Sequence, residues 1–347
     1  MRLESVKLAL PSRRLSNEDV VALVRQHSER TYVGDLNEAL DKIRFLLQLS
    51  GAESRYWLGE GETPLGHISC AVNEALTEAH CRREDIELLI YVGVDRGFIE
   101  PANAYFVAHA LGMDRVHCFD LLDACNSWSR ALHLVYALFQ AGAYKRAMLI
   151  NAEFGMFEGG AIYPDLFTLR SIEEIEWSFG GYTLGEGAAA TILVHDPERE
   201  WEFRFSSRPD LADLCAVPLE GYERYCRPSN RIGRNGVRRF TSFGHEMFSE
   251  GAKEAIELFQ QLETPLDEVR VIFPHAASKK AWDDGAASLG LQHLLYNIYP
   301  RCGNLISASV PAGMALAIEE GRIEREDRIV CCVGSAGMSF AAYSFVY

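Results

Sequence analysis

The sequence predicts an α/β protein built from two similar halves, and an internal repeat is the main observation behind this prediction. Residues 66–94 and 244–275 each read as a Gly-His start, an amphipathic helix, an acidic turn and a mainly apolar strand. The repeat begins at Gly66 and again at Gly244, 178 positions later. Strands that alternate with helices imply sheets covered by helices. A duplicated unit of this kind predicts two halves related by a pseudo-twofold axis.

The other elements recur in the same order within each half. After the first repeated unit, the apolar periodicity predicts a helix, a strand, a helix and a strand at residues 104–112, 116–122, 129–144 and 146–153. After the second unit, it predicts the same series at 279–290, 293–299, 307–321 and 328–334. Each half also has an opening and a closing strand, at 3–10 and 190–196, and at 201–207 and 340–347. We therefore place the two halves at residues 1–198 and 199–347.

Composition and charge exclude several classes of protein. The 347 residues carry a net charge of −15, which argues against a nucleic-acid-binding protein. No apolar run reaches transmembrane length, and the first residues lack the apolar region of a signal peptide. The nine cysteines form no C-x-x-C pair, which indicates reduced thiols in a cytoplasmic protein without a zinc site. Adjacent Cys331 and Cys332 lie in a predicted strand and should pack on opposite faces of its sheet.

Cys125 is the first candidate for a functional residue. It follows an apolar strand and stands at the start of an amphipathic helix, within DACNSW. Unpaired backbone N–H groups and the helix dipole favour an anion at such a place, so we expect a lowered thiol pKa and a nucleophile. The alternative is a small buried apolar residue, which is the usual role of an arbitrary cysteine.

The repeat connects two more polar residues with Cys125. Asn304 stands near the start of the equivalent helix in the second half, 179 positions after Cys125. Because the two helix starts should converge near the pseudo-twofold axis, we expect these residues to meet there. His275 ends a strand of the second half and can reach the same place. Taken singly, His275 could be a satisfied strand-end histidine and Asn304 a helix N-cap.

This arrangement of Cys, His and Asn on a duplicated chain resembles the thiolase superfamily, and within it the 3-oxoacyl-(acyl carrier protein) synthase III family. Four segments carry the resemblance, in the family's order. DACNSW resembles A-C-x-G-[FW], with Ser127 in place of the glycine, and LGEGAAATIL resembles a turn of the form F-G-D-G-A. PHAASKK resembles P-H-Q-A-N-x-R, and GNLISASVP resembles G-N-T-S-A-A-S-[VI]-P.

The resemblance implies a thiolase-like fold of five layers, α-β-α-β-α, and a homodimer. It also implies that Cys125 is the nucleophile and that His275 and Asn304 complete the catalytic site. Backbone N–H groups of Cys125, Ala336 and Gly337 are then the expected oxyanion donors. The implied substrates are acyl thioesters of coenzyme A or of acyl carrier protein, in fatty acid or polyketide biosynthesis, with no cofactor and no metal.

The sequence also departs from the family pattern. Ala276 and Ser278 replace the Gln and Asn that follow the histidine. Phe45 and Leu49 stand where the family has the aromatic and basic residues that help to hold coenzyme A, whereas Arg55 is retained. A segment of roughly ten extra residues within GGAIYPDLFTLRSIEEIEW is of the size that often covers a site.

Four residues and one loop are further candidates for contacts with the substrate or the carrier. Glu100 matches a family loop that crosses the dimer interface and closes the partner's acyl pocket. A carboxylate there would disfavour plain aliphatic acyl chains, unless the loop is simply solvated. Trp128 is a candidate pocket residue, and Lys279 and Lys280 fall near the family's carrier-docking position. The arginine-rich stretch 227–240 is either a solvated loop or a phosphate site.

The chemistry that these residues permit is acyl transfer followed by carbon–carbon bond formation. A thiolate can store an acyl group as a thioester, and a malonyl thioester then loses CO₂ to give a carbanion. Neutral His275 and the Asn304 amide are suitable donors to the oxygen on which charge develops. Two alternatives remain open: an acyltransferase of the same fold that uses an alcohol or an amine, and an inactive partner subunit. A papain-like protease is disfavoured because its cysteine is followed directly by tryptophan near the mature N-terminus.

Overall fold

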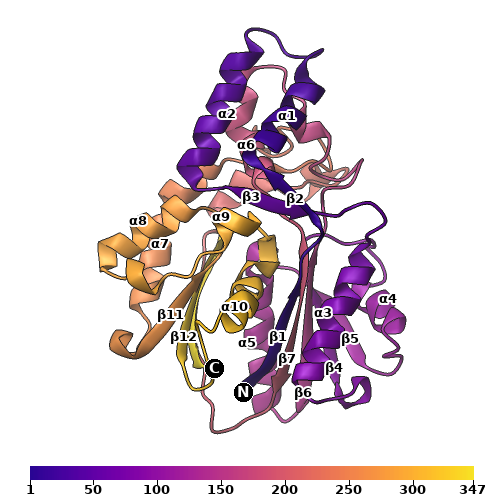
Figure 1. Cartoon of the computed structure of the whole chain (residues 1–347), viewed down its shortest axis with the longest axis vertical. Coiled ribbons are helices and arrows are strands. Elements are labelled where there is room, and N and C mark those ends of the chain that lie inside the picture. Colours follow the sequence, from indigo (N-terminus) through magenta and orange to yellow (C-terminus); the bar gives the residue numbers. More distant parts are fainter.

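The computed structural model describes residues 1–347 as two β-sheets with helices between and around them (Figure 1). The first sheet has the order β1-β7-β6-β4-β5, with β1 (Arg2–Ala9), β4 (Leu88–Val92), β5 (His117–Leu121), β6 (Arg146–Glu153) and β7 (Gly187–Val194). The second has the order β11-β12-β13-β8, with β8 (Glu202–Ser207), β11 (Val269–Pro274), β12 (Arg328–Ser335) and β13 (Ser339–Val346). Two short ribbons pair β2 (Arg13–Ser16) with β3 (Ser54–Trp57), and β9 (Cys215–Ala216) with β10 (Thr241–Ser242). The boundary after residue 198 stays a prediction.

Six of the helices occupy three layers around these sheets, and the other four belong to a separate apolar cluster. Their bounds are α1 (Asn17–Ser28), α2 (Leu36–Ser50), α3 (Pro64–Glu78), α4 (Asn103–Ala110), α5 (Ser127–Gln140), α6 (Ile175–Tyr182), α7 (Gly244–Gln260), α8 (Lys279–Leu289), α9 (Tyr299–Cys302) and α10 (Ser309–Glu319). Helices α5 and α10 pack between the two sheets (Figure 1). Helices α3 and α4 cover the outer face of the first sheet, and α7 and α8 cover that of the second. The five-layered α-β-α-β-α prediction is therefore confirmed. None of the helices combines the length and apolar character that a membrane span requires.

Alternation of side chains along the strands produces these layers. Successive residues of a strand point to opposite faces, and strands buried on both faces need apolar residues throughout. In β4, Ile90 faces the middle layer, whereas Leu89 faces α3 and α4. In β12, Cys331 faces the middle layer and Cys332 faces the α7 side. The predicted packing role of these two cysteines is therefore confirmed.

The strand expected at residues 293–299 does not form. This segment makes a 3-10 turn η8 (Gln292–Leu294), a single bridge between Leu295 and Ile272, and then α9. Pro300 lies at the start of α9, where proline is favoured because its missing N–H needs no partner. The first half has the full strand β5 at the corresponding place. Loss of this strand explains why the second sheet has four strands and the first has five.

The inserted segment at residues 159–177 packs as part of an apolar core. Ile162, Leu166 and Phe167 are buried in one cluster with side chains of α1 and α2. The same cluster contains Ala276 and Leu305, the neighbours in sequence of two predicted site residues. In Figure 1, α1, α2 and α6 lie together at one end of the molecule, beside the β2–β3 ribbon. The insertion is therefore fixed close to the predicted site.

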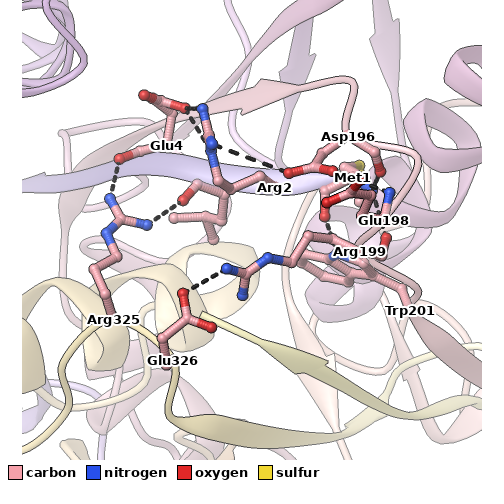
Figure 2. Close-up of polar contacts among 10 residues, drawn as sticks. Met1, Arg2, Glu4, Asp196, Glu198, Arg199, Trp201, Arg325 and Glu326 are labelled. Carbon is pink, nitrogen blue, oxygen red and sulfur yellow. Dashed lines mark hydrogen bonds and ion pairs between the residues drawn. The ribbon is translucent and has the colours of Figure 1, made fainter.

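Polar contacts hold β1 to the second half at the opposite end of the molecule (Figure 2). The Arg325 guanidinium donates to the carbonyls of Leu3 and Glu4 at 2.7 and 2.5 Å. Arg199, in the connection between β7 and β8, pairs with Glu326 at 2.5 Å. These contacts join the first strand of the chain to the turn before β12, so they fix the two sheets relative to one another.

Candidate active site

Cys125 lies in a tight turn between β5 and α5. The 3-10 turn η2 (Ala124–Asn126) begins at Ala124 with a φ of 45°, a left-handed conformation that is uncommon for a residue with a Cβ. The Ser127 hydroxyl ties this turn, because it accepts from the amide of Asp123 at 2.8 Å and donates to the carbonyl of Ala124 at 2.7 Å. Half-buried Cys125 is thus held two residues ahead of α5.

The second half repeats this turn ahead of α10. The 3-10 turn η9 (Ile306–Ala308) also begins with a left-handed residue, at φ 50°. The two turns start 182 positions apart, whereas the Gly-His starts of the repeat are 178 apart. The structural counterpart of Cys125 is therefore Ser307, and the expected equivalence with Asn304 is wrong. The offset between equivalent positions grows from 178 to 182 along the repeat because the connecting loops of the two halves differ in length. Asn304 lies just before the η9 turn.

His275 and Asn304 form a hydrogen-bonded pair. The Nε2 of His275 lies 3.2 Å from Oδ1 of Asn304, which also accepts from the amide of Ile306 at 2.8 Å. Because Oδ1 is an acceptor in both contacts, His275 donates from Nε2. The Trp282 indole donates to the carbonyl of His275 at 2.5 Å and steadies this residue from α8. The NH₂ group of Asn304 makes none of these contacts and is available to a ligand.

The end of β12 brings the three predicted residues to one place. The amide of His275 donates to the carbonyl of Cys332 at 2.8 Å, and the histidine ring faces the Gly334 backbone. The Ser335 hydroxyl, next along β12, faces the thiol of Cys125. The η2 turn packs against both β12 and η9, and Asn304 immediately precedes η9. Cys125, His275 and Asn304 therefore lie around the same strand end.

Burial sets the protonation of both titratable groups. Removal from water raises the pKa of the Cys125 thiol well above its ordinary range, with further contributions from Cys215 and Glu153. The expected lowering of this pKa is therefore wrong: desolvation outweighs the favourable field at the helix start. Burial also lowers the pKa of His275 to about 4, so its imidazole is neutral near pH 7.

The turn between β12 and β13 holds the expected oxyanion donors. Ala336 and Gly337 lie in this turn, directly after Ser335. The next residue, Met338, exchanges backbone hydrogen bonds with Arg208 at 2.8 and 3.1 Å, which anchors the turn. No backbone bond from the amides of Ala336 or Gly337 stabilises the turn itself. These two amides are therefore free to donate to a ligand.

Two further candidates, Glu100 and Trp128, differ in burial. Glu100 is exposed, in a loop where Phe98 and Ile99 expose 43% and 82% of their surface. Trp128 is buried in the middle layer and donates to the Thr191 hydroxyl at 3.1 Å, so it packs in the core. A pocket role for Trp128 stays a prediction.

The basic candidates are largely occupied by acidic neighbours. Lys279 and Lys280 pair with Asp283 and Asp284 one turn along α8. In the 227–240 loop, Arg231 pairs with acidic side chains of other segments. Such exposed ion pairs contribute little energy, and their side chains can exchange partners. Docking of a carrier by these cations therefore stays a prediction.

The residues that matter to coenzyme A recognition in the resembled family differ in exposure. Phe45 and Leu49 expose 60% and 45% of their surface on α2. Arg55 is fully buried, donates to Oδ1 of Asn17 at 2.9 Å and has a pKa lowered to about 10 by burial. Arg55 therefore has a packing position, and its charge faces no solvent.

Two residues of the site were not among the sequence candidates. Glu153 is fully buried at the end of β6, and Ser307 is its hydrogen-bond partner in η9. The signal for Glu153 was present, because a carboxylate directly after an apolar strand must find donors or be exposed. Ser307 could not be found in this way, since its role depends on the register between the two halves.

Comparisons with known proteins agree with this architecture. Residues 259–347 match the model of the 3-oxoacyl-[acyl-carrier-protein (ACP)] synthase III C-terminal family. The chain is 25% identical over 279 residues to the beta-ketoacyl-[acyl-carrier-protein] synthase III of Fusobacterium nucleatum, covering 78% of this chain and 79% of that protein. It is 24% identical over 339 residues to the same enzyme of Agrobacterium fabrum, covering 96% and 95%.

Solved structures show the same fold over the whole chain. OleA from Xanthomonas campestris with bound lauric acid and lauroyl-CoA superposes with a TM-score of 0.82 and 20% identity, over 99% of this chain and 98% of that one. A variant of OleA with a replaced glutamate superposes with a TM-score of 0.81, over 99% and 96%. At this identity the match concerns the fold. The chain is therefore similar to 3-oxoacyl-(acyl carrier protein) synthase III enzymes and has a thiolase-like fold.

Proposed function

We propose that this protein is a ketosynthase III-like enzyme that uses Cys125, His275 and Asn304. It would transfer an acyl group from a thioester to Cys125 and then condense it with a malonyl thioester. The observation that carries this proposal is the neutral His275–Asn304 pair at the strand end where the Cys125 turn also packs. The names of the curated relatives support the same reaction class.

The first step of the proposed reaction forms a thioester on Cys125. The sulfur attacks the carbonyl carbon of the acyl donor, the bond to the donor's sulfur breaks, and the thiol proton leaves with the released coenzyme A or carrier thiol. Because burial keeps Cys125 protonated in the free protein, this proton has to move as the donor binds. Amides of Cys125, Ala336 and Gly337 would stabilise the oxyanion of the tetrahedral intermediate.

The second step needs a carbanion. The carbon–carboxylate bond of a malonyl thioester breaks, CO₂ leaves, and the electron pair becomes an enolate with charge on the thioester oxygen. On binding of the malonyl thioester, Nε2–H of His275 would exchange its bond to Oδ1 of Asn304 for one to that oxygen, and the NH₂ group of Asn304 would donate to the same oxygen. A histidine with a pKa of about 4 remains a neutral donor throughout the physiological range. The enolate carbon then attacks the acyl-Cys125 thioester and releases the thiolate.

The proposal is tested by incubating the purified protein with an acyl thioester and a malonyl thioester, of coenzyme A and of a carrier protein in separate reactions. We expect release of CO₂ together with a 3-oxoacyl thioester, each measured by mass spectrometry. Acyl transfer to an added alcohol or amine without CO₂ release would replace the condensation by the acyltransferase reaction. Absence of any acyl adduct on the protein would favour the inactive partner subunit.

The proposal includes a homodimer that works in the cytoplasm without a cofactor. The nine cysteines are all free thiols, which suits a reducing compartment. The loop around Glu100 exposes Phe98 and Ile99 beside Tyr105 and Phe106 of α4. Exposed apolar side chains that gather in this way are typical of a protein interface. A second copy of the chain on this loop would bring Glu100 near the partner's site.

Glu100→Leu should then shift the choice of acyl donor. An unpaired carboxylate in the partner's pocket disfavours aliphatic chains, so we expect kcat/KM for aliphatic over polar acyl donors to rise about tenfold. Steady-state kinetics with matched donor pairs measures this ratio, and Glu60→Leu, at another exposed loop glutamate, is the control. An unchanged ratio would leave Glu100 as a solvated residue, and sedimentation as a monomer at micromolar concentration would remove the homodimer.

A further inference from the structure

Glu153 is a buried carboxylate with an unusually complete set of donors. It ends β6 and accepts from the amides of Val94 and Asp95, each at 3.1 Å. It also accepts from the amide of Ser307 at 3.3 Å and from the Ser307 hydroxyl. No basic side chain pairs with it, and these hydrogen bonds only partly offset the cost of burying a charge, because burial and the neighbouring Asp95 raise the pKa of Glu153 to about 8. Two of the four donors come from the second half of the chain.

Ser307 connects Glu153 to Asn304. Its hydroxyl accepts from the side-chain amide of Asn151 at 3.1 Å, so it is held from two residues of β6. Ser307 is the second residue of the η9 turn, and the first residue of that turn donates its amide to Oδ1 of Asn304. Glu153 thus fixes, from the first sheet, the turn of the second half that orients the Asn304 side chain.

The two halves exchange such contacts reciprocally. Glu153 is the last residue of β6 and Ser335 is the last residue of β12, 182 positions later, the same offset that relates Cys125 to Ser307. Ser335 of the second half faces Cys125 of the first, while Glu153 of the first half faces Ser307 of the second. The two contacts differ in chemistry. Ser335 presents a hydroxyl group to Cys125, whereas Glu153 presents to Ser307 a carboxyl group that can carry charge.

We propose that Glu153 is a positioning residue of the active site, which fixes the Asn304 turn through Ser307 and opposes negative charge on the neighbouring Cys125. The first role rests on the proposed function, and the second does not. Cys125 neighbours Glu153 because its η2 turn packs against η9, whose Ser307 binds Glu153. The titratable groups that face Glu153 are Asp95 after β4, Tyr91 within β4, and Cys125 in η2. Glu186 faces Asp95 and completes the acidic surroundings.

The electrostatic role is tested by the pH profile of Cys125 alkylation with iodoacetamide. Burial and the neighbouring Asp95 raise the pKa of Glu153 to about 8, so its carboxyl group is ionised only at alkaline pH. Ionised Glu153 opposes a second negative charge nearby, so Glu153→Gln should let Cys125 form its thiolate at lower pH. We expect alkylation of the Cys125 peptide between pH 9 and 10, followed by mass spectrometry, to become about threefold faster. Glu202→Gln is the matched control, since that carboxylate of β8 also accepts from two backbone amides, those of Glu263 and Thr264, and should leave the profile unchanged. An unchanged profile in Glu153→Gln would overturn the proposal.

The geometric role is tested by separating the two chemical steps. Ser307→Ala removes the hydroxyl but keeps the backbone, so self-acylation of Cys125 should stay within twofold while kcat for malonyl decarboxylation falls about tenfold at unchanged KM. Ser309→Ala is the control, because that buried hydroxyl has no hydrogen-bond partner. Glu153→Gln and the double variant should show non-additive losses in decarboxylation. Additive losses, or equal losses in both steps, would contradict the positioning role. A wild type without decarboxylation would remove the proposed function and leave the alkylation result intact.

Discussion

Cys125→Ala should carry no acyl group after incubation with any acyl thioester that labels the wild type. The replacement removes the only sulfur in the η2 turn, and nothing in that turn can take over as a nucleophile. Intact mass spectrometry should show one adduct per wild-type chain and none in the variant. This is the largest effect that we expect, since it abolishes the covalent intermediate and every later step with it.

Cys215→Ala is the matched control for this experiment. Cys215 is close enough to Cys125 to contribute to the raised pKa of its thiol, and it belongs to a different element, the β9–β10 ribbon. We expect Cys215→Ala to keep the full adduct. An adduct that persists in Cys125→Ala and disappears in Cys215→Ala would assign the nucleophile to the ribbon and contradict our proposal.

His275→Ala and Asn304→Ala should separate acylation from condensation. Each replacement removes one of the two proposed donors to the enolate oxygen, so we expect malonyl decarboxylation to fall about 10²- to 10³-fold. Self-acylation should persist to a measurable degree, because its oxyanion is served by backbone amides. Release of CO₂ from labelled malonyl thioester and the mass of the protein adduct report the two steps on the same sample.

Controls are needed because Asn304 also supports the backbone. Its Oδ1 accepts from the amide of Ile306 at 2.8 Å, and loss of such a bond costs about 1 kcal/mol of folding stability. Thermal unfolding of Asn304→Ala therefore has to accompany the kinetics. His293→Ala, at an exposed histidine before α9, should leave both steps unchanged. Decarboxylation retained in both His275→Ala and Asn304→Ala would favour the non-condensing acyltransferase.

Local periodicity and the repeat were sufficient to predict two similar α/β halves, whereas the five layers were implied by the family resemblance. Alternation within the strand at residues 328–334 placed Cys331 and Cys332 on opposite faces, as the structure confirms. The helix and strand order of each half also follows from patterns of a few residues, which depend on near neighbours in the chain. The segment 293–299 is an exception, because a single bridge and a helix beginning at Tyr299 replace the expected strand. Helices α1 and α2 and the β2–β3 ribbon were not predicted.

The sequence by itself determined the two-sheet architecture and the three polar residues proposed for the site. Only the tertiary structure decided how those residues are placed and charged. The raised pKa of Cys125 depends on desolvation by the surrounding elements, which no local pattern reports. The structural equivalence of Cys125 and Ser307 depends on the lengths of the loops between the repeated elements. The offset read from the sequence therefore pointed to Asn304 instead. The contact of Glu153 with Ser307 joins residues 154 positions apart, and such a contact exists only once both sheets have packed on the middle helices.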